Sequence, residues 1–211
     1  MGEANPSVLV IDDDAEFRDS VVRLLRSVDL DIQQFSSVAD FSKAKLSDGP
    51  TCLVLDVRMP GRSGLELQRD LAAANRQVPI IFITAHADVP MTVQAMKGGA
   101  IEFLTKPFRD QELLDAIQLG LSRDRARREN EKGLAALRER FAVLSPRERE
   151  IMIGVARGRL SKQIAGEIGI AEATVKVHRS RAMQKMNTRS LPELSRMADK
   201  LKLVPEEPQH S

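Results

Sequence analysis

The chain has 211 residues, of which 42% are hydrophobic and 29% are charged, and its formal net charge is +2. These values are ordinary for a globular protein of one or two domains, and no apolar run approaches the roughly 20 residues that cross a bilayer. The segment after Met1 is charged, so we expect no secretory signal, and a single cysteine excludes an internal disulfide framework. We therefore expect a cytoplasmic protein that does not enter a membrane.

The first half of the chain alternates short apolar runs with helical patterns. The pattern predicts strands at residues 7–11, 31–35, 51–56, 79–84 and 102–105, with helices at about 15–28, 37–46, 64–75, 89–98 and from 110 onward. Such alternation is typical of a doubly wound parallel sheet covered by helices on both faces. With the strand order 2-1-3-4-5, the polar strand DIQQF would lie at an edge, and ligand sites would gather at the carboxyl ends of the strands.

The helical pattern that begins near Asp110 continues well beyond this sheet. After the polar run RDRARRENEK, the apolar residues Leu134, Leu137, Phe141 and Leu144 follow at a 3-4-3 spacing, which is typical of a coiled-coil seam. We predict a helical linker over residues 123–140 that can pair with a second chain. A flexible polar tether is the alternative, because Gly133 weakens a helix.

The last third of the chain is helical and basic. Residues 145–202 contain four helical stretches and no strand pattern, and Ser145 followed by Pro146 indicates a helix start. Residues 1–120 hold 12 Lys and Arg against 18 Asp and Glu, whereas residues 121–211 hold 20 against 12. This asymmetry indicates a second, all-α domain over 141–203 that faces a polyanion, followed by a disordered tail at 204–211. Uneven solvation of the surface is the alternative interpretation.

Carboxylates follow two strands that are neighbours in the predicted sheet. Asp12 and Asp13 follow the first strand, and Asp56 ends the third. These groups repel one another unless a cation lies among them, and a set of oxygen ligands favours Mg²⁺ or Mn²⁺ over zinc. Thr84 ends the fourth strand and Lys106 follows the fifth. A metal, a carboxylate, a hydroxyl and an ammonium at one edge form a site for a phosphoryl group.

The segments VIDDD, LVLDVRMPG, FITAH and FLTKPF resemble the receiver domain of two-component response regulators over residues 6–122, which predicts a receiver domain over 1–122, and the stretch that begins at AHADVP resembles its FixJ branch. The resemblance implies that Asp56 accepts a phosphoryl group from a histidine kinase. The metal ligands that it implies are Asp12, Asp13, Asp56 and the backbone carbonyl of Arg58. The residues that it implies to contact the phosphoryl group, or to move with it, are Thr84, Lys106 and Phe103, with a cis bond between Lys106 and Pro107.

Dehalogenase-type phosphatases also place a nucleophilic aspartate at a strand end, but they require a second aspartate two residues later as the general acid. Arg58 stands at that position, so protonation of the leaving group would fail. We therefore expect no enzyme, apart from Mg²⁺-dependent self-phosphorylation and slow autodephosphorylation at Asp56.

The segment from LSPRERE to MNTRS resembles the LuxR-type helix-turn-helix domain. We expect Ser161 to cap the first helix of the motif, Gly169 to supply the turn, and Val175, Ala182 and Met186 to form the inner face of the recognition helix. Ala171, where a serine is common in the family, is a poor N-cap.

The outward face of the same helix is basic, and we assign Met183 to it as well. By resemblance, Lys176, Val177 and Ser180 occupy base-reading positions. The candidate DNA-contacting residues, within a motif from Ser161 to Ser180, are Lys162, Thr174, Lys176, Val177, His178, Arg179, Ser180 and Arg181. A solvated basic face is the alternative.

Together these features predict a phosphorylation-controlled transcriptional regulator of the FixJ/LuxR class. We expect phosphorylation to promote a homodimer, whose two recognition helices would match the two halves of a near-palindromic promoter site. We expect an activator with RNA polymerase as a further partner. A signalling adaptor that acts by protein–protein contact is the rival hypothesis.

Overall fold

The structure, a computed structural model, describes residues 5–45 and 47–203. The predicted disordered tail, residues 204–211, lies outside the described residues. The chain forms two compact units, one up to Arg128 and the other from Glu129 onward. Among the described helices, none is both long and apolar enough to cross a membrane.

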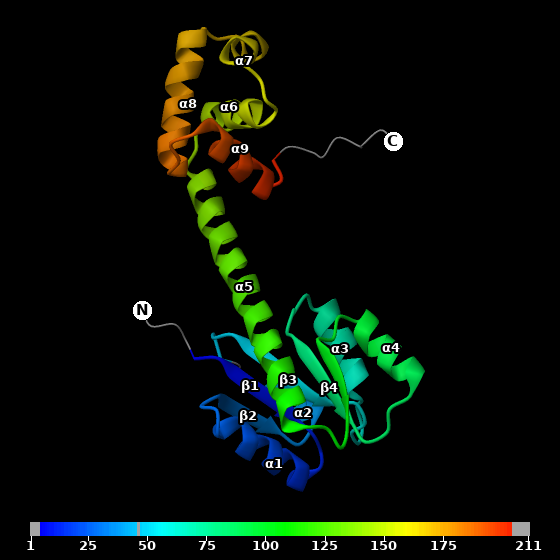
Figure 1. Ribbon diagram of the computed structural model, residues 1–211. Coiled ribbons are helices and arrows are strands. Elements are labelled where there is room, and N and C mark those ends of the chain that lie inside the picture. The colour runs from blue at the N-terminus through cyan, green and yellow to red at the C-terminus, as the bar shows by residue number, and fades with distance from the viewer. Residues whose placement is uncertain (1–4, 46, 204–211) are drawn as a thin grey trace. The chain divides into compact units, whose positions relative to one another are not determined.

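The first unit is built on a five-stranded parallel sheet with the order β2-β1-β3-β4-β5 (Figure 1). Its strands are Ser7–Ile11 (β1), Asp31–Phe35 (β2), Thr51–Asp56 (β3), Ile80–Thr84 (β4) and Glu102–Thr105 (β5). This agrees with the predicted sheet and with β2 as an edge strand. β1, β3 and β4 are buried along their whole length, as expected of strands covered on both faces.

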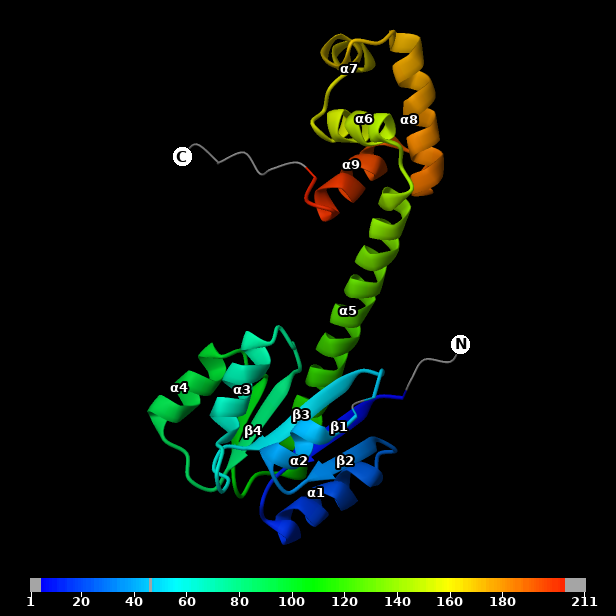
Figure 2. The same cartoon turned by 180° about the vertical axis from the view of Figure 1, so that it is seen from behind.

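Helices cover both faces of the sheet, as Figure 1 and Figure 2 show from opposite sides. They are Ala15–Arg26 (α1), Val38–Lys43 (α2), Gly64–Ala73 (α3), Val89–Lys97 (α4) and Asp110–Ala142 (α5). α1 and the first part of α5 pack on one face around Val10 and Ile83, and α2, α3 and α4 pack on the other around Leu55 and Phe82.

α5 approaches the sheet closely at Gly120. A Cβ atom at this position would lie 2.6 Å from Sγ of Cys52 on β3, so only glycine fits without a shift. Burial is the main cause that raises the pKa of the Cys52 thiol to about 12. Cys52 is therefore a core thiol and not a reactive one.

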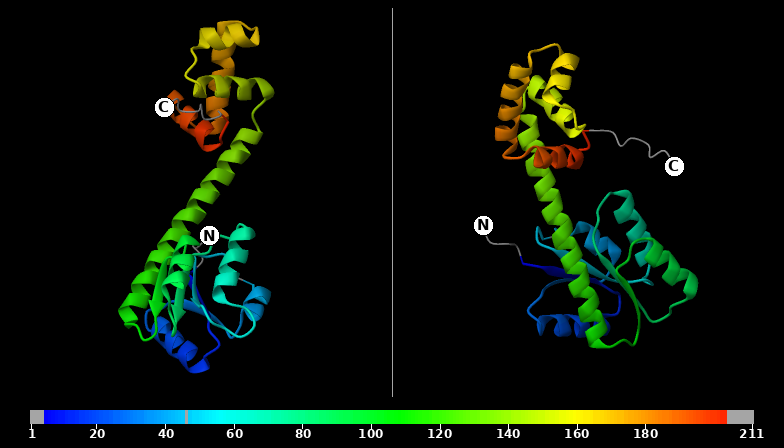
Figure 3. Two further views of the ribbon diagram at one scale, coloured as in Figure 1. Left: turned by 90° about the vertical axis from the view of Figure 1, so that its right-hand side faces the viewer. Right: turned by 45° about the horizontal axis from the view of Figure 1, so that its top comes forward.

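The second unit is all-α and contains the end of α5 and four further helices, as predicted. These are Pro146–Ala156 (α6), Ser161–Ile168 (α7), Glu172–Met186 (α8) and Leu191–Lys200 (α9). In both views of Figure 3 the yellow, orange and red helices gather into one cluster. Ser145 caps α6 and Pro146 is its first residue, as expected.

The apolar stripe of the predicted linker is used within the chain. α5 is continuous through Gly133, so this part of the chain is a helix and not a flexible tether. Leu137 and Leu144 are buried in the core of the second unit, and Phe141 packs against the same core. The 3-4-3 spacing that suggested a seam for a second chain is therefore explained by packing onto α6, α8 and α9.

Candidate functional site

Three aspartates meet at the carboxyl ends of β1 and β3. The register pairs Ile11 with Leu55, so the next residues, Asp12 and Asp56, lie side by side. Asp12, Asp13 and Asp56 each offer a carboxylate oxygen, and these oxygens lie within 4.8 Å of one another. Asp12 and Asp56 are buried whereas Asp13 is exposed, so the cluster is rigid on one side and open to solvent on the other.

Local backbone geometry fixes these carboxylates. The N–H of Asp14 donates to Oδ1 of Asp12 at 2.9 Å, and the N–H of Arg58 donates to Oδ1 of Asp56 at 3.1 Å. The Asp14 side chain caps α1, as predicted, by accepting from the N–H of Phe17. Gly64 lets α3 begin directly beside Asp56, because a Cβ there would lie 2.3 Å from the Asp56 carbonyl oxygen.

The Lys106 ammonium lies among the carboxylates. Its Nζ is 2.7 Å from Oδ2 of Asp12 and 3.4 Å from Oδ2 of Asp56. The same atom lies 3.7 Å from the centroid of the Phe17 ring, a cation–π contact that limits where the side chain can point. The bond between Lys106 and Pro107 is cis, as expected.

Burial and the neighbouring Asp12 charge raise the pKa of Asp56, although the N–H of Arg58 and the Lys106 ammonium oppose this. The ionised carboxylate is therefore less stable here than in water, and an added cation would relieve the repulsion. Three clustered carboxylates form a hard-oxygen donor set that fits Mg²⁺ or Mn²⁺.

The two other predicted residues at this edge come from β4 and β5. Thr84 is buried at the end of β4, one position beyond the residue that pairs with Asp56, and its Oγ1 accepts from the N–H of His86 at 3.3 Å. Its carbonyl oxygen accepts from the N–H of Lys106 at 2.8 Å. Phe103 is half-buried on β5, with its ring centroid 6.2 Å from that of Phe82. The predicted residues thus converge on one edge of the sheet.

In the second unit, α7 and α8 form a helix-turn-helix. Gly169 ends α7 in the left-handed conformation, with φ +67°, as its predicted role in the turn requires. Ile164, Ala165 and Val175 pack into one core cluster with Ile151 of α6. As expected, Ala171 precedes α8 without a side-chain cap.

The exposed side of α8 carries most of the predicted DNA-contacting residues. Val177 is 50% exposed, which is unusual for an apolar side chain on a helix that also contributes to a core. Lys176 is exposed and pairs with Glu172 at 2.8 Å, one turn earlier. The other exposed candidates are Thr174, Ser180 and Arg181 on α8 and Lys162 on α7.

Three details of the motif differ from the prediction. Leu160, not Ser161, is the N-cap of α7, and Ser161 instead accepts a hydrogen bond from Arg179 at 3.1 Å. Arg179 and Met183 are half-buried, because they lie four and eight residues after the buried Val175 and so beside the inner face. Arg179 therefore connects α8 to α7.

His178 is also half-buried, and its Nδ1 has no hydrogen-bond partner within residues 5–45 and 47–203. Lys185, a further basic residue of α8, donates to Glu148 of α6 at 2.7 Å. Burial works to raise the pKa of Glu148, but the contacts with Lys185 and Ser145 outweigh it and lower the pKa. This pair holds α8 against α6.

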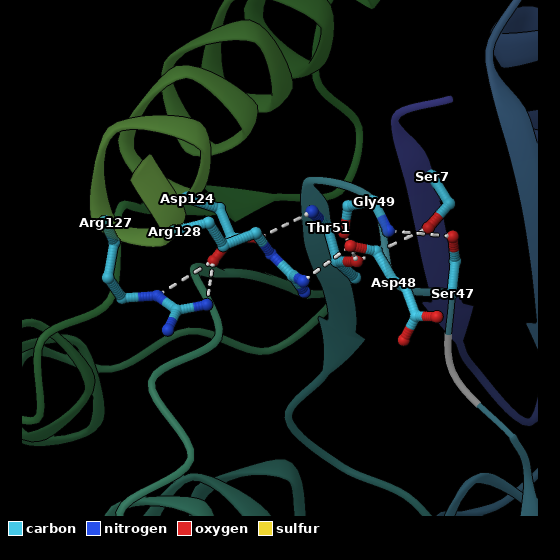
Figure 4. A network of polar contacts seen from close by, with 8 residues as sticks. All are labelled: Ser7, Ser47, Asp48, Gly49, Thr51, Asp124, Arg127 and Arg128. Carbon is cyan, nitrogen blue, oxygen red and sulfur yellow. Dashed lines mark hydrogen bonds and ion pairs between the residues drawn. The ribbon is translucent and has the colours of Figure 1, made fainter. Parts of the chain in front are cut away.

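The sequence prediction overlooked a buried carboxylate in the polar run of α5. Asp124 is 1% exposed, and its Oδ2 accepts from the backbone N–H of Thr51 at 2.8 Å, as Figure 4 shows. Arg127 and Arg128, three and four residues later on the helix, both pair with it at 2.6 Å. An aspartate followed by arginines at these two spacings is the only sequence signal, and it is common on exposed helices.

Comparison with known families identifies both units. Residues 8–118 match the model of the response regulator receiver domain, and residues 142–198 match that of the bacterial regulatory proteins of the luxR family. The chain is a response regulator of the FixJ/LuxR type. Nodulation protein W of Bradyrhizobium diazoefficiens is 52% identical over 194 residues, which cover 92% of this chain and 86% of that protein. The transcriptional regulatory protein FixJ of Azorhizobium caulinodans is 43% identical over 198 residues, which cover 94% of this chain and 93% of that protein.

Solved structures of this family share the fold. The response regulator StyR superposes with a TM-score of 0.82 at 49% identity, covering 93% of this chain and all of that one. Full-length FixJ from B. japonicum superposes with a TM-score of 0.56 at 40% identity, covering 94% of this chain and 98% of that one. These comparisons confirm the predicted family and the predicted fold, a CheY-like sheet with a helical DNA-binding domain. They also confirm the predicted function class, a phosphorylation-controlled transcription regulator. A receiver domain implies a histidine kinase as partner, and a luxR-family domain implies DNA.

Proposed function

We propose that Asp56 of this response regulator is the phosphoacceptor. One carboxylate oxygen attacks the phosphorus of a phosphohistidine on the kinase, the P–N bond breaks, the imidazole leaves, and an acyl phosphate forms. The observation that carries this assignment is the position of Asp56 at the carboxyl end of β3, buried and within reach of two further carboxylates and the Lys106 ammonium. Small phosphodonors would serve in place of the kinase, and the acyl phosphate would hydrolyse slowly.

The cation of the site would be Mg²⁺ or Mn²⁺, held by the carboxylates of Asp12, Asp13 and Asp56 and by the carbonyl of Arg58. It would supply positive charge that allows the phosphoryl oxygens to approach the carboxylates. Lys106 then exchanges its contact with Asp12 for one with a phosphoryl oxygen. The exposed position of Asp13 supports this assignment, because it gives a cation a path into the cluster.

Phosphorylation adds about −1.5 to −2 charges at Asp56. The Thr84 hydroxyl turns to donate to a phosphoryl oxygen and releases the N–H of His86, which changes the start of the β4–α4 loop. Phe103 fills the space that Thr84 leaves. Three exposed apolar residues at helical spacing on α4, namely Val89, Val93 and Met96, support an adjoining surface on which two phosphorylated chains form a homodimer.

The dimer places two copies of α8 in successive major grooves of a near-palindromic promoter site. Lys176, Val177 and Ser180 read base edges, while Lys162, Thr174, His178 and Arg181 contact the phosphate backbone. Arg179 belongs to the same surface but acts mainly by positioning α7 through Ser161. The regulator works in the cytoplasm as an activator, with RNA polymerase as its further partner.

This scheme divides the chain into a receiver domain over residues 1–122, a helical linker over 123–140 and a DNA-binding domain over 141–203. The boundary between the two compact units, after Arg128, supports a linker in this range.

Labelling with a small phosphodonor and Mg²⁺ tests the assignment of Asp56. We expect the wild type to gain one acid-labile acyl phosphate, detected by intact mass, and Asp56→Asn to gain none. Asp14→Asn is the matched control, because Asp14 only caps α1 and asparagine is an equivalent cap. Equal labelling of wild type and Asp56→Asn would contradict the proposal.

Footprinting of genomic DNA with and without the phosphodonor tests the output. We expect protected sites with two-fold symmetry whose occupancy rises on phosphorylation. The adaptor hypothesis predicts instead that Lys176→Ala with Arg181→Ala leaves gene control intact.

A further inference from the structure

A cavity of about 420 Å³ lies in the first unit at the amino-terminal ends of β4 and β5. Pro79 and Ile80 at the start of β4 and Ile101 before β5 line it, whereas Asp56 lies at the carboxyl edge of the sheet. This volume is within the range of roughly 300–1,000 Å³ that small-molecule sites occupy. The cavity is therefore distinct from the phosphoacceptor site and large enough for a small ligand.

The interior of the cavity is apolar. Leu71 of α3, Val78, Ile80 and Ile101 contribute side chains, and Leu71 and Ile80 are almost completely buried. Gln68, which is 5% exposed, closes one side, and its Nε2 donates to the carbonyl oxygen of Ala95 at 3.0 Å. The side-chain amide donor is thus already used, and an apolar group can rest on this wall.

Two guanidinium groups without a carboxylate partner stand at the rim. Arg76 comes from the α3–β4 loop and Arg123 from α5, and both are exposed. Within the part of the chain that the structure describes, neither side chain makes a hydrogen bond or an ion pair. They are therefore available to an anion from solution.

The carboxylate that lines the cavity cannot neutralise them. Asp124 is buried and already accepts from Arg127, Arg128 and the N–H of Thr51, as the dashed lines of Figure 4 show. One carboxylate and three guanidinium groups, those of Arg76, Arg123 and Arg127, line the cavity, so its surroundings keep an excess of positive charge. The positive charge attracts an anion to the rim, and the apolar walls beneath it can receive an apolar group of the same ligand.

We propose that this cavity binds a small amphiphilic carboxylate, that is, an apolar ring or short chain that carries one carboxylate. The apolar body rests on Leu71, Ile80 and Ile101, and Arg76 and Arg123 hold the carboxylate, which matches the planar fork of a guanidinium group. This binding goes beyond the proposed function, because it requires neither Asp56 nor a phosphoryl group. The ligand contacts α5 beside Asp124, where the helix leaves the sheet, and so gives the regulator a second, chemical input.

Methyl NMR of the full-length protein tests the proposal, with 2-naphthoate as probe and 2-naphthalenemethanol as its neutral counterpart. We expect saturable shifts of the Leu71, Ile80 and Ile101 methyl groups with naphthoate. The alcohol should bind at least about tenfold more weakly, since it lacks the charge-assisted hydrogen bonds, a difference of about 1.4 kcal/mol. Arg76→Gln with Arg123→Gln should weaken naphthoate binding by a similar factor, and the control Arg26→Gln on α1 should not.

Equal affinity for acid and alcohol, shifts confined to methyl groups outside the cavity, or no saturable shift up to the solubility of the probe would each overturn the proposal. Undiminished naphthoate binding by the double variant would also overturn it. Should that variant not fold, the comparison of acid and alcohol on the wild type decides alone. Phosphodonor labelling of Asp56 is unaffected by any of these results, so failure here is distinguishable from failure of the proposed function.

Discussion

Replacement of Asp124 by alanine should destabilise the first unit through a contact that no sequence motif revealed. The Asp124 carboxylate accepts from the N–H of Thr51 at 2.8 Å and pairs with Arg127 and Arg128 at 2.6 Å. Asp124→Ala removes all three contacts. Thr51 is 2% exposed, so water cannot replace the lost acceptor without a rearrangement at the start of β3.

The expected magnitude follows from these contacts. A buried N–H left without an acceptor costs about 1–3 kcal/mol. The two ion pairs add less, about 0–1 kcal/mol each, because the arginine side chains are 27% and 28% exposed and solvent screens them. Alanine returns about 0.5 kcal/mol through its higher helix propensity. We expect a net loss of about 2.5 kcal/mol in the free energy of unfolding, or about 10 °C in melting temperature for a unit of this size.

Scanning calorimetry of the full-length protein is the suitable assay, because the chain contains neither Trp nor Tyr as an intrinsic fluorophore. Asp115→Ala is the matched control: Asp115 lies on the same helix, is exposed, and within the described residues its side chain accepts only from Gln111. Both variants gain the same helix propensity, so their difference isolates the buried contacts. If the two variants unfold within about 0.5 kcal/mol of each other, the reasoning is refuted.

Asp13→Ala should leave the metal-free stability unchanged, because Asp13 is exposed, but should abolish the stabilisation by Mg²⁺, about 2.7 kcal/mol for a wild type at one hundred times its Kd. Burial raises the pKa of Asp56, so the ionisation of this carboxyl should contribute a loss of stability as pH rises through the ordinary carboxylate range and beyond, seen as the difference between the wild-type and Asp56→Asn curves. Asp56→Asn should lack this loss and melt higher than the wild type at pH 7 without metal. Lys106→Met should destabilise the metal-free protein about 2 kcal/mol more than Lys97→Met in urea unfolding followed by circular dichroism, because two carboxylates lose their cation. Lys162→Ala should reduce the slope of log K against log salt for promoter DNA by about 1 without changing sequence preference.

Each of these expectations has a contradicting result. A full Mg²⁺ shift in Asp13→Ala would exclude Asp13 as a ligand. Parallel pH–stability curves for wild type and Asp56→Asn would mean that ionisation of Asp56 does not oppose folding. Equal effects of Lys106→Met and Lys97→Met would remove the structural role of the ammonium, and an unchanged salt slope in Lys162→Ala would exclude a phosphate contact.

The architecture of the first unit was predictable because each strand carries a local signal. Runs such as VLVI and IIFI are apolar throughout because both faces of the sheet are covered, whereas the polar DIQQF is typical of an edge. Strand order then brings Asp12, Asp13 and Asp56 together, since the carboxyl ends of neighbouring parallel strands share one edge. The acidic cluster that we propose as the phosphoacceptor site is therefore predictable from the sequence once the strand order is known.

The helix-turn-helix was predictable to the level of faces but not of individual side chains. Helical spacing identified Val175, Ala182 and Met186 as buried. It did not reveal that the side chain of Arg179 would bind Ser161 of α7. A long polar side chain beside a core can reach either solvent or a neighbouring helix, and helical spacing does not distinguish the two. The choice depends on the position of α7, which local sequence does not encode.

The sequence by itself determined the strands, the helices, the acidic edge and the basic helix, because each depends on periodicity, on turn residues or on which strands are neighbours. Features that depend on contacts between residues far apart in the sequence were decided only by the tertiary structure. Leu137 and Phe141 of the apolar stripe of α5 pack against the core formed by α6, α8 and α9. Asp124 lies in a polar run of α5 whose sequence is typical of a solvated helix. It is buried because its partner is the backbone N–H of Thr51, 73 positions away along the chain. The unpaired Arg76 and Arg123 come together only because the α3–β4 loop and α5 fold over the same end of the sheet.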